Sequence, residues 1–239
     1  MRSEFTGMIG ALFRVWHRYF NLPLPGRLKN VALSGGRKYE AAAIVLGSWL
    51  AGIFISVVAL LVTLIFNRFG GALAFTLLAY GLLLNHDRGS GDGMVARMIS
   101  EKLPGEYIPF DQIMPILTVI LKLFLLAVLF FYGSPWFLGC VFAGGAAMEV
   151  YLAGMMEVSP PLIDSSEASR TRFWVTVVGI GIISFLISAL AASCGALAFV
   201  LLWKYAGKLT EQRGITIHGI RGYGAICLWL MLLAGVLTI

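Results

Sequence analysis

Long runs of apolar residues dominate the pattern along this chain. Runs that can cross about 30 Å of hydrocarbon at 1.5 Å per residue predict membrane-spanning helices at 41–66, 113–131 and 136–156. A shorter run at 69–84 and a last one at 223–239 add two more spans. The composition agrees, because 59% of the residues are hydrophobic and only 13% are charged, about half the charged share of soluble domains. The sequence therefore predicts an integral membrane protein.

Residues 173–203 form an apolar run of 31 residues that contains no charge. This length is too great for one comfortable span and short for two. Because lipid excludes an exposed loop but tolerates one at the interface, the small residues at 191–195 predict a tight reversal there. The predicted fold class is thus all-α, a polytopic membrane helical bundle of about seven transmembrane helices.

The lysines and arginines predict the orientation of these spans. Sixteen of them fall in four segments, with seven, three, two and four in 1–40, 85–112, 157–172 and 204–222. The connections on the other side hold only Arg68, and Lys122 lies within a span. Positive charge collects on the inner side of membranes, so we expect the N-terminus inside and the C-terminus outside. The net charge of +6 is then explained by topology and does not indicate nucleic-acid binding.

The chain before the first span has a different pattern. Apolar residues between 8 and 20 are interleaved with Arg14, His17 and Arg18, which predicts an amphipathic helix in the cytoplasmic interface. No uninterrupted apolar stretch of a cleavable signal occurs here. We therefore divide the chain into a cytoplasmic amphipathic N-terminal segment, 1–40, and a transmembrane helical domain, 41–239.

The loop after the second span holds the most informative polar residues. Asp87 and Asp92 lie among three glycines at the membrane end of that span. Mg²⁺ prefers carboxylate oxygens together with substrate phosphates, and glycine lets the backbone approach a phosphate closely. A solvated loop with ordinary turn glycines is the alternative interpretation, and the residues alone leave both open.

Part of this loop has the form of a known signature. The run Asp92-Gly93-Met94-Val95-Ala96-Arg97 resembles D-G-x-x-A-R, the first half of the motif of CDP-alcohol phosphatidyltransferases. In that family the aspartates hold a divalent metal on a diphosphate at the cytoplasmic ends of adjoining spans. The second half of the motif is not in register, because Gly105 and Asp111 are spaced too widely.

The layout of nearly the whole chain resembles cobalamin synthase, the membrane adenosylcobinamide-GDP ribazoletransferase family. Residues 21–25 are similar to its R-L-P-V-P-like turn, and the loop with Asp87 and Asp92 is similar to its acidic segment. Residues 214–222 resemble its late G-x-T-G-D-x-x-G turn, with His218 where the aspartate stands in the family. The middle aspartate of the acidic segment has no counterpart, so the resemblance is to a divergent member.

The resemblance implies a multi-pass transferase of a bacterial or archaeal inner membrane. It implies that an activated cobinamide-GDP is joined to an alpha-ribazole or its phosphate with release of GMP, and that Mg²⁺ is the cofactor. Asp87 and Asp92 are then the metal ligands, and together with His218 they are the catalytic residues. The substrate-binding residues implied are His86, Arg97, Asp111, Thr216 and Arg221. The implied partners are a nucleotide-activated small molecule and the lipid bilayer, with a homo-oligomer or other cobalamin-pathway membrane proteins left open.

Two other functions remain open at this point. A CDP-alcohol phosphatidyltransferase-like enzyme would use the same chemistry and release CMP. A catalytically inactive paralogue, or a non-enzymatic membrane partner, would account for the missing acidic positions.

Two charged residues lie within the predicted spans. Lys122 is in the third span and Glu149 in the fourth, and both fall near mid-depth. A charge is costly in hydrocarbon, so the two are expected to pair between neighbouring helices. We interpret such a pair as a clamp between helices rather than as a substrate site.

Overall fold

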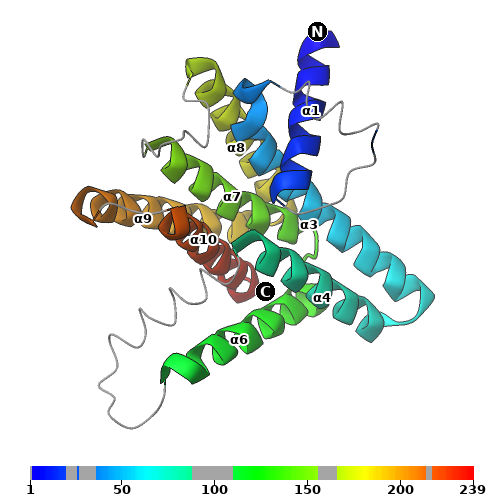
Figure 1. The fold of residues 1–239 in the computed structure, drawn as a ribbon. Helices are drawn as coiled ribbons and strands as arrows, with labels where there is room; N and C mark the ends of the chain where they lie inside the picture. Colours follow the sequence, from blue (N-terminus) through cyan, green and yellow to red (C-terminus); the bar gives the residue numbers. More distant parts are fainter. Residues whose placement is uncertain (1, 20–25, 27–35, 88–109, 156–165, 214–216) are drawn as a thin grey trace.

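The computed structural model describes residues 2–19, 26, 36–87, 110–155, 166–213 and 217–239. Nearly all of these residues are helical, and none of them lies in a strand, which confirms the all-α class. A first helix and a short 3₁₀ helix precede seven long helices (Figure 1). The elements are α1 (Arg2–Tyr19), η1 (Arg37–Tyr39), α3 (Glu40–Ile65), α4 (Arg68–Asp87), α6 (Phe110–Tyr132), α7 (Phe137–Met155), α8 (Glu167–Ile187), α9 (Ala189–Arg213) and α10 (Ile217–Leu237).

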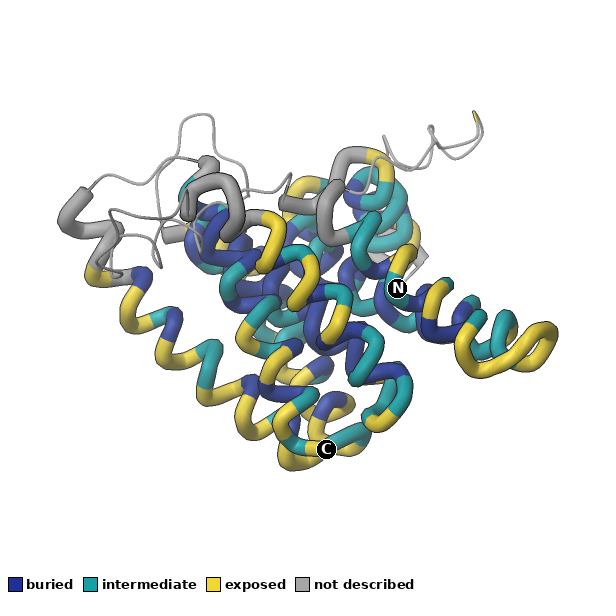
Figure 2. Tube along the Cα trace, turned by 90° about the horizontal axis from the view of Figure 1, so that it is seen from below, coloured by how far each residue is buried: buried dark blue, intermediate teal, exposed yellow. Residues whose placement is uncertain are grey.

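Five helices are long and apolar enough to cross a membrane: α3 with η1, α7, α8, α9 and α10. Within the described residues α4 and α6 contribute shorter apolar stretches, Arg68–Leu82 and Ile116–Tyr132. Many residues on the outward faces of the helices are exposed (Figure 2). Large apolar side chains are among them, and Leu64, Phe69 and Leu186 are each more than three-quarters exposed. Soluble proteins rarely expose apolar patches of this extent. These features indicate a membrane protein, while the count of seven spans stays a prediction.

The centre of the bundle is α7, which packs most extensively on α3 and α10 (Figure 1). At its crossing with α3, glycine meets glycine, since a Cβ on Gly52 would lie 2.5 Å from the Gly139 nitrogen. The hydroxyl of Ser56 lies 2.6 Å from the Pro135 carbonyl, so the turn before α7 is held against α3 as well. Small residues at such crossings let two helices approach closely in lipid.

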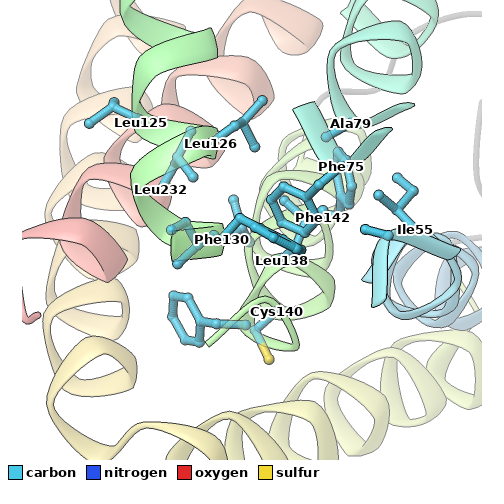
Figure 3. Packing of buried hydrophobic residues seen from close by; sticks show 14 of the residues in the cluster. Ile55, Phe75, Ala79, Leu125, Leu126, Phe130, Leu138, Cys140, Phe142 and Leu232 are labelled. Atoms are coloured by element: carbon cyan, nitrogen blue, oxygen red, sulfur yellow. The ribbon is translucent and has the colours of Figure 1, made fainter. Parts of the chain in front are cut away.

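The largest apolar cluster joins α7 to five other helices: α3, α4, α6, α9 and α10. Figure 3 shows Phe142 and Leu138 of α7 meeting Phe75 of α4 and Ile55 of α3, with Phe130 of α6 beside them. The rings of Phe75 and Phe130 have centroids 5.3 Å apart. Leu232 brings α10 into the same cluster. This core fixes which helices are neighbours, and through them the positions of the helix ends.

The break in the long apolar run does not lie where the sequence predicted it. Residues 191–195 are inside α9, and the chain breaks at Ser188, whose backbone is extended with φ −156° and ψ 97°. The Ser188 N–H donates to the Ser184 carbonyl, and its own carbonyl accepts from the Ala192 N–H, so a single residue separates two hydrogen-bonded helices. Ala191 is instead buried in the core. Of the small residues predicted to form the turn, Ala191 and Gly195 are buried within the bundle.

The predicted amphipathic helix is present as α1, and it packs beside the first turns of α3. Gly7 lies against Tyr39, and Val15 lies against Gly47, the same separation of 32 residues along the chain in both contacts. The two helices therefore run parallel. Ala11 and Val15 are buried here, so the apolar face of α1 is covered by protein.

Arg14 joins the same two helices through an ion pair. Its guanidinium donates to the Glu40 carboxylate at 2.7 Å, at the very start of α3. Arg14 lies between Ala11 and Val15 in sequence, and their contacts on α3 are further along that helix. The side chain thus reaches back toward the helix end, as long basic side chains do near an interface.

Candidate functional site

Five of the predicted site residues belong to the ends of α4, α6 and α10, and these three helices contact one another. The first turn of α4 meets the last turn of α6, because Arg68 donates to the Phe131 carbonyl and the Phe69 and Phe131 rings have centroids 5.5 Å apart. The two helices are therefore antiparallel. Phe69 and Asp87 are separated by about 27 Å at 1.5 Å per residue, which brings the end of α4 level with the start of α6.

The third helix, α10, runs parallel to α6. The Lys122 ammonium lies 5.5 Å from the centroid of the Trp229 ring. Further along, a Cβ on Gly133 would lie 2.7 Å from the Cδ1 of Ile239. The two residues in contact are 107 positions apart in the sequence at Lys122 and 106 apart at Gly133. This nearly constant offset means that α6 and α10 run parallel and that their starts lie at one level. The end of α4 and the starts of α6 and α10 thus lie toward one end of the bundle.

These ends carry several of the predicted site residues. His86 and Asp87 close α4, Asp111 is the second residue of α6, and His218 is the second residue of α10. For these four the structure describes the backbone alone. Arg221 is described fully and is partly buried one turn further along α10. The remaining predicted residues lie outside the described part of the chain: Asp92, Arg97 and Thr216.

The helix ends themselves favour an anion. α6 and α10 both begin at this level, so the positive ends of their dipoles face the same side. Arg221 adds a full positive charge within the second turn of α10. An arrangement of this kind suits a phosphate group, which guanidinium binds through two parallel hydrogen bonds.

Polar side chains continue from this end into the interior of the bundle. Lys122 is only 2% exposed, and Thr118, one turn before it on α6, is also buried. Glu149 of α7 is 6% exposed. Charged groups this deep in an apolar bundle are functional candidates by default.

Glu149 packs directly against α10. A Cβ on Gly224 would lie 2.5 Å from the Glu149 Oε1, so only glycine leaves room for this carboxylate. Arg221 is three residues before Gly224 and therefore on the same face of α10. Lys122 and Glu149 both contact α10, at Trp229 and Gly224, which are about 7.5 Å apart along the helix axis.

The sequence did not identify Gly224 and Trp229 as partners of these charges. The pairing of Lys122 with Glu149 stays a prediction. A signal for Gly224 did exist, because Gly222 and Gly224 interrupt an otherwise bulky apolar helix. For Trp229 no pattern along the chain distinguishes a ring that faces an amine from one that faces lipid.

Among the side chains that the structure describes, no three histidines, cysteines, aspartates or glutamates are grouped to hold a metal ion. The chain matches no family model, no curated protein and no solved structure. The candidate site therefore rests on the three helix ends and on the chemistry of the residues they carry.

Proposed function

We propose that seven helices cross the membrane, with the N-terminus inside and the C-terminus outside. The seven long helices of the bundle follow one another with short turns at the end that carries Arg68, the single cation predicted outside. Reporter fusions or cysteine accessibility at Gly133, Ser165 and Ile239 test this, and we expect outside, inside and outside respectively. An inside C-terminus would contradict the proposal.

We further propose that the protein is a membrane phosphotransferase of the cobalamin synthase type, acting at the inner end of the bundle. One observation supports this most strongly: α4, α6 and α10 are mutual neighbours, and their ends at one level carry Asp87, Asp111 and His218. These residues are far apart in the sequence, and a transferase that handles a diphosphate needs acidic, basic and phosphate-binding groups together. The bacterial or archaeal inner membrane is part of the same proposal.

The reaction proposed is the transfer of a phosphorus-containing group. An oxygen of the acceptor, the alpha-ribazole or its phosphate, attacks the cobinamide-bound phosphorus of the activated cobinamide-GDP. The bond from that phosphorus to the bridging oxygen breaks, and GMP leaves with its electron pair. Arg221 and Arg97 bind phosphate oxygens, and His218 accepts the proton of the attacking group.

Mg²⁺ is the cofactor that this chemistry implies. The carboxylates of Asp87 and Asp92 are hard oxygen ligands, the type that Mg²⁺ prefers. When bound, the ion neutralises charge on the diphosphate. His86, Asp111 and Thr216 line the same end as substrate-binding residues in this proposal.

Substitution of Asp92 by asparagine tests the proposal, because it keeps the size and removes the charge. We expect Asp92→Asn to abolish GMP release and Mn²⁺ binding measured by water relaxation, with the melting temperature unchanged. Asp164→Asn makes the same chemical change in another loop predicted on that side and is the matched control, with GMP release retained. Release of GMP by Asp92→Asn at the wild-type rate would refute the assignment.

The same assay separates the other two functions. Release of CMP from a CDP-alcohol, without GMP release, would indicate the CDP-alcohol phosphatidyltransferase-like enzyme. Absence of both products, together with no Mn²⁺ binding by the wild-type protein, would indicate the inactive paralogue or a non-enzymatic partner.

A further inference from the structure

A second feature lies at the same end of the bundle but on other helices, where η1 meets the start of α8. Tyr39 is buried there, and two cations lie over its ring. The Lys38 ammonium is 5.1 Å from the ring centroid, and the Arg172 guanidinium carbon is 4.8 Å from it. The two charges are thus at most about 10 Å apart, the sum of these distances.

The local charge balance is positive. Arg37 adds a third cation beside Lys38, and it is exposed. Among the described side chains here, Glu40 is paired with Arg14 at 2.7 Å, and Glu167 lies in the first turn of α8. Like charges within about 10 Å of each other repel, and an anion bound near both reduces the repulsion.

A shallow cavity of about 440 Å³ adjoins this cluster. It is lined by Glu167, Ala168, Thr171 and Arg172, so it opens along one face of α8. The volume is of the size that holds a small polar group. Arg172 thus belongs both to the cavity and to the Tyr39 cluster.

The face of α8 that lines the cavity continues as an apolar stripe. Val175, Val178 and Ile182 follow Thr171 at helical spacing, and they are 67%, 57% and 59% exposed. A cavity that has Arg172 in its wall therefore leads into an exposed apolar surface along the same face of α8. A molecule that fits both has an anionic head and a hydrocarbon tail.

We infer that η1 and the start of α8 form a binding site for an anionic phospholipid, with its phosphate between Lys38 and Arg172 and an acyl chain along Val175, Val178 and Ile182. Basic residues next to a membrane helix attract anionic lipids, and here the aromatic ring of Tyr39 holds two of them in place. The apolar stripe favours a lipid over a free phosphate ion, because only the lipid has a hydrocarbon chain that can pack against it. The inference is independent of the proposed transferase activity.

The test uses the full-length protein in detergent, with phosphatidylglycerol, phosphatidylethanolamine, phosphatidylcholine or inorganic phosphate added. We expect phosphatidylglycerol alone to raise the melting temperature and to be retained on the protein in native mass spectrometry. Lys38→Gln and Arg172→Gln should each weaken phosphatidylglycerol binding about tenfold, the loss of one charge-assisted contact. Lys38 is exposed, so its variant remains informative if Arg172→Gln fails to fold.

Arg68→Gln is the matched control, because Arg68 also lies over an aromatic ring, 5.4 Å from the centroid of Phe131, at the opposite end of the bundle. This variant should bind phosphatidylglycerol as the wild type does. Three results would overturn the inference: equal stabilisation by inorganic phosphate, stronger binding of phosphatidylethanolamine, or equal losses in Arg68→Gln and Lys38→Gln.

Discussion

The helices α7 and α8 have the same mean hydropathy of 1.5 over their apolar spans, yet their surroundings differ. In α7, 78% of that span is buried inside the protein, whereas in α8 only 17% is. What differs is the size of the side chains. α7 presents Gly139, Gly144 and Gly145 to its neighbours, and α8 presents valine, isoleucine and leucine outward. Lipid chains are as apolar as the side chains, so moving an apolar side chain from lipid into the protein stabilises the bundle little. Close packing of small residues therefore decides which helix is central.

The comparison is sharpest at glycine. Gly52→Ala would place a Cβ 2.5 Å from the Gly139 nitrogen, a contact with backbone that cannot move aside. We expect it to force α3 and α7 apart and to lower the free energy of unfolding by about 3 kcal/mol. Gly179→Ala on α8, where nothing lies within 4 Å, should change it by less than about 0.5 kcal/mol. Denaturant titration of the two variants in micelles measures this, and equal losses would contradict the packing argument.

Substitutions of charged residues test the same difference between the interior of the bundle and its exposed surface. Lys122→Ala and Glu149→Ala should each cost about 2–3 kcal/mol, because each leaves a charge in the bundle interior without its predicted partner. The double substitution should recover part of the loss. Glu167→Ala, on the exposed start of α8, should have little effect on stability. Strictly additive losses of stability in a double-mutant cycle would show that Lys122 and Glu149 do not interact.

A smaller effect is expected at Gly224. Its alanine variant meets the Glu149 side chain, which can move by rotation, so we expect a loss of about 1–2 kcal/mol. Adding Glu149→Ala should remove most of the additional cost of Gly224→Ala. Gly181→Ala on α8, again with nothing within 4 Å, is the control. If Gly224→Ala costs the same with and without Glu149, the two residues do not share the contact.

The smallest expected difference is between two valines. Val141 of α7 is completely buried, and Val178 of α8 is 57% exposed. Val141→Ala should lower the free energy of unfolding by about 1 kcal/mol, since the cavity left behind loses dispersion contacts. Val178→Ala removes contacts with solvent or lipid that the unfolded chain also makes, and its thermal unfolding should stay close to that of the wild type.

Much of the helix arrangement along the chain followed from the apolar runs. The predicted span 41–66 corresponds to α3 within one residue at each end, because Asn67 stops the run and its side chain accepts from the Gly70 N–H at 2.7 Å. The break within 173–203 was placed a few residues too late. A cluster of small residues has the same composition whether it turns or packs closely, and here Gly195 faces Met231 of α10.

For the candidate site, the sequence predicted the level of the residues but not their neighbours. The predicted alternation of spans puts Asp87 and His218 on one side. That α4, α6 and α10 are adjacent depends on packing between residues distant in sequence, such as Lys122 against Trp229, which no periodicity along one helix contains. For the same reason the sequence predicted a shared depth for Lys122 and Glu149 but not their contacts with Trp229 and Gly224 of α10.

The parallel pairing of α1 with α3 has a consequence for the order in which the protein is assembled. In a chain made from its N-terminus, α1 is synthesised before the helix that covers its apolar face. An isolated helix of this length is only marginally stable in water, so Ala11 and Val15 acquire their buried positions after α3 has been inserted. The helix that comes first in this chain is therefore packed late, and interference with the insertion of α3 should expose α1 to proteolysis during synthesis.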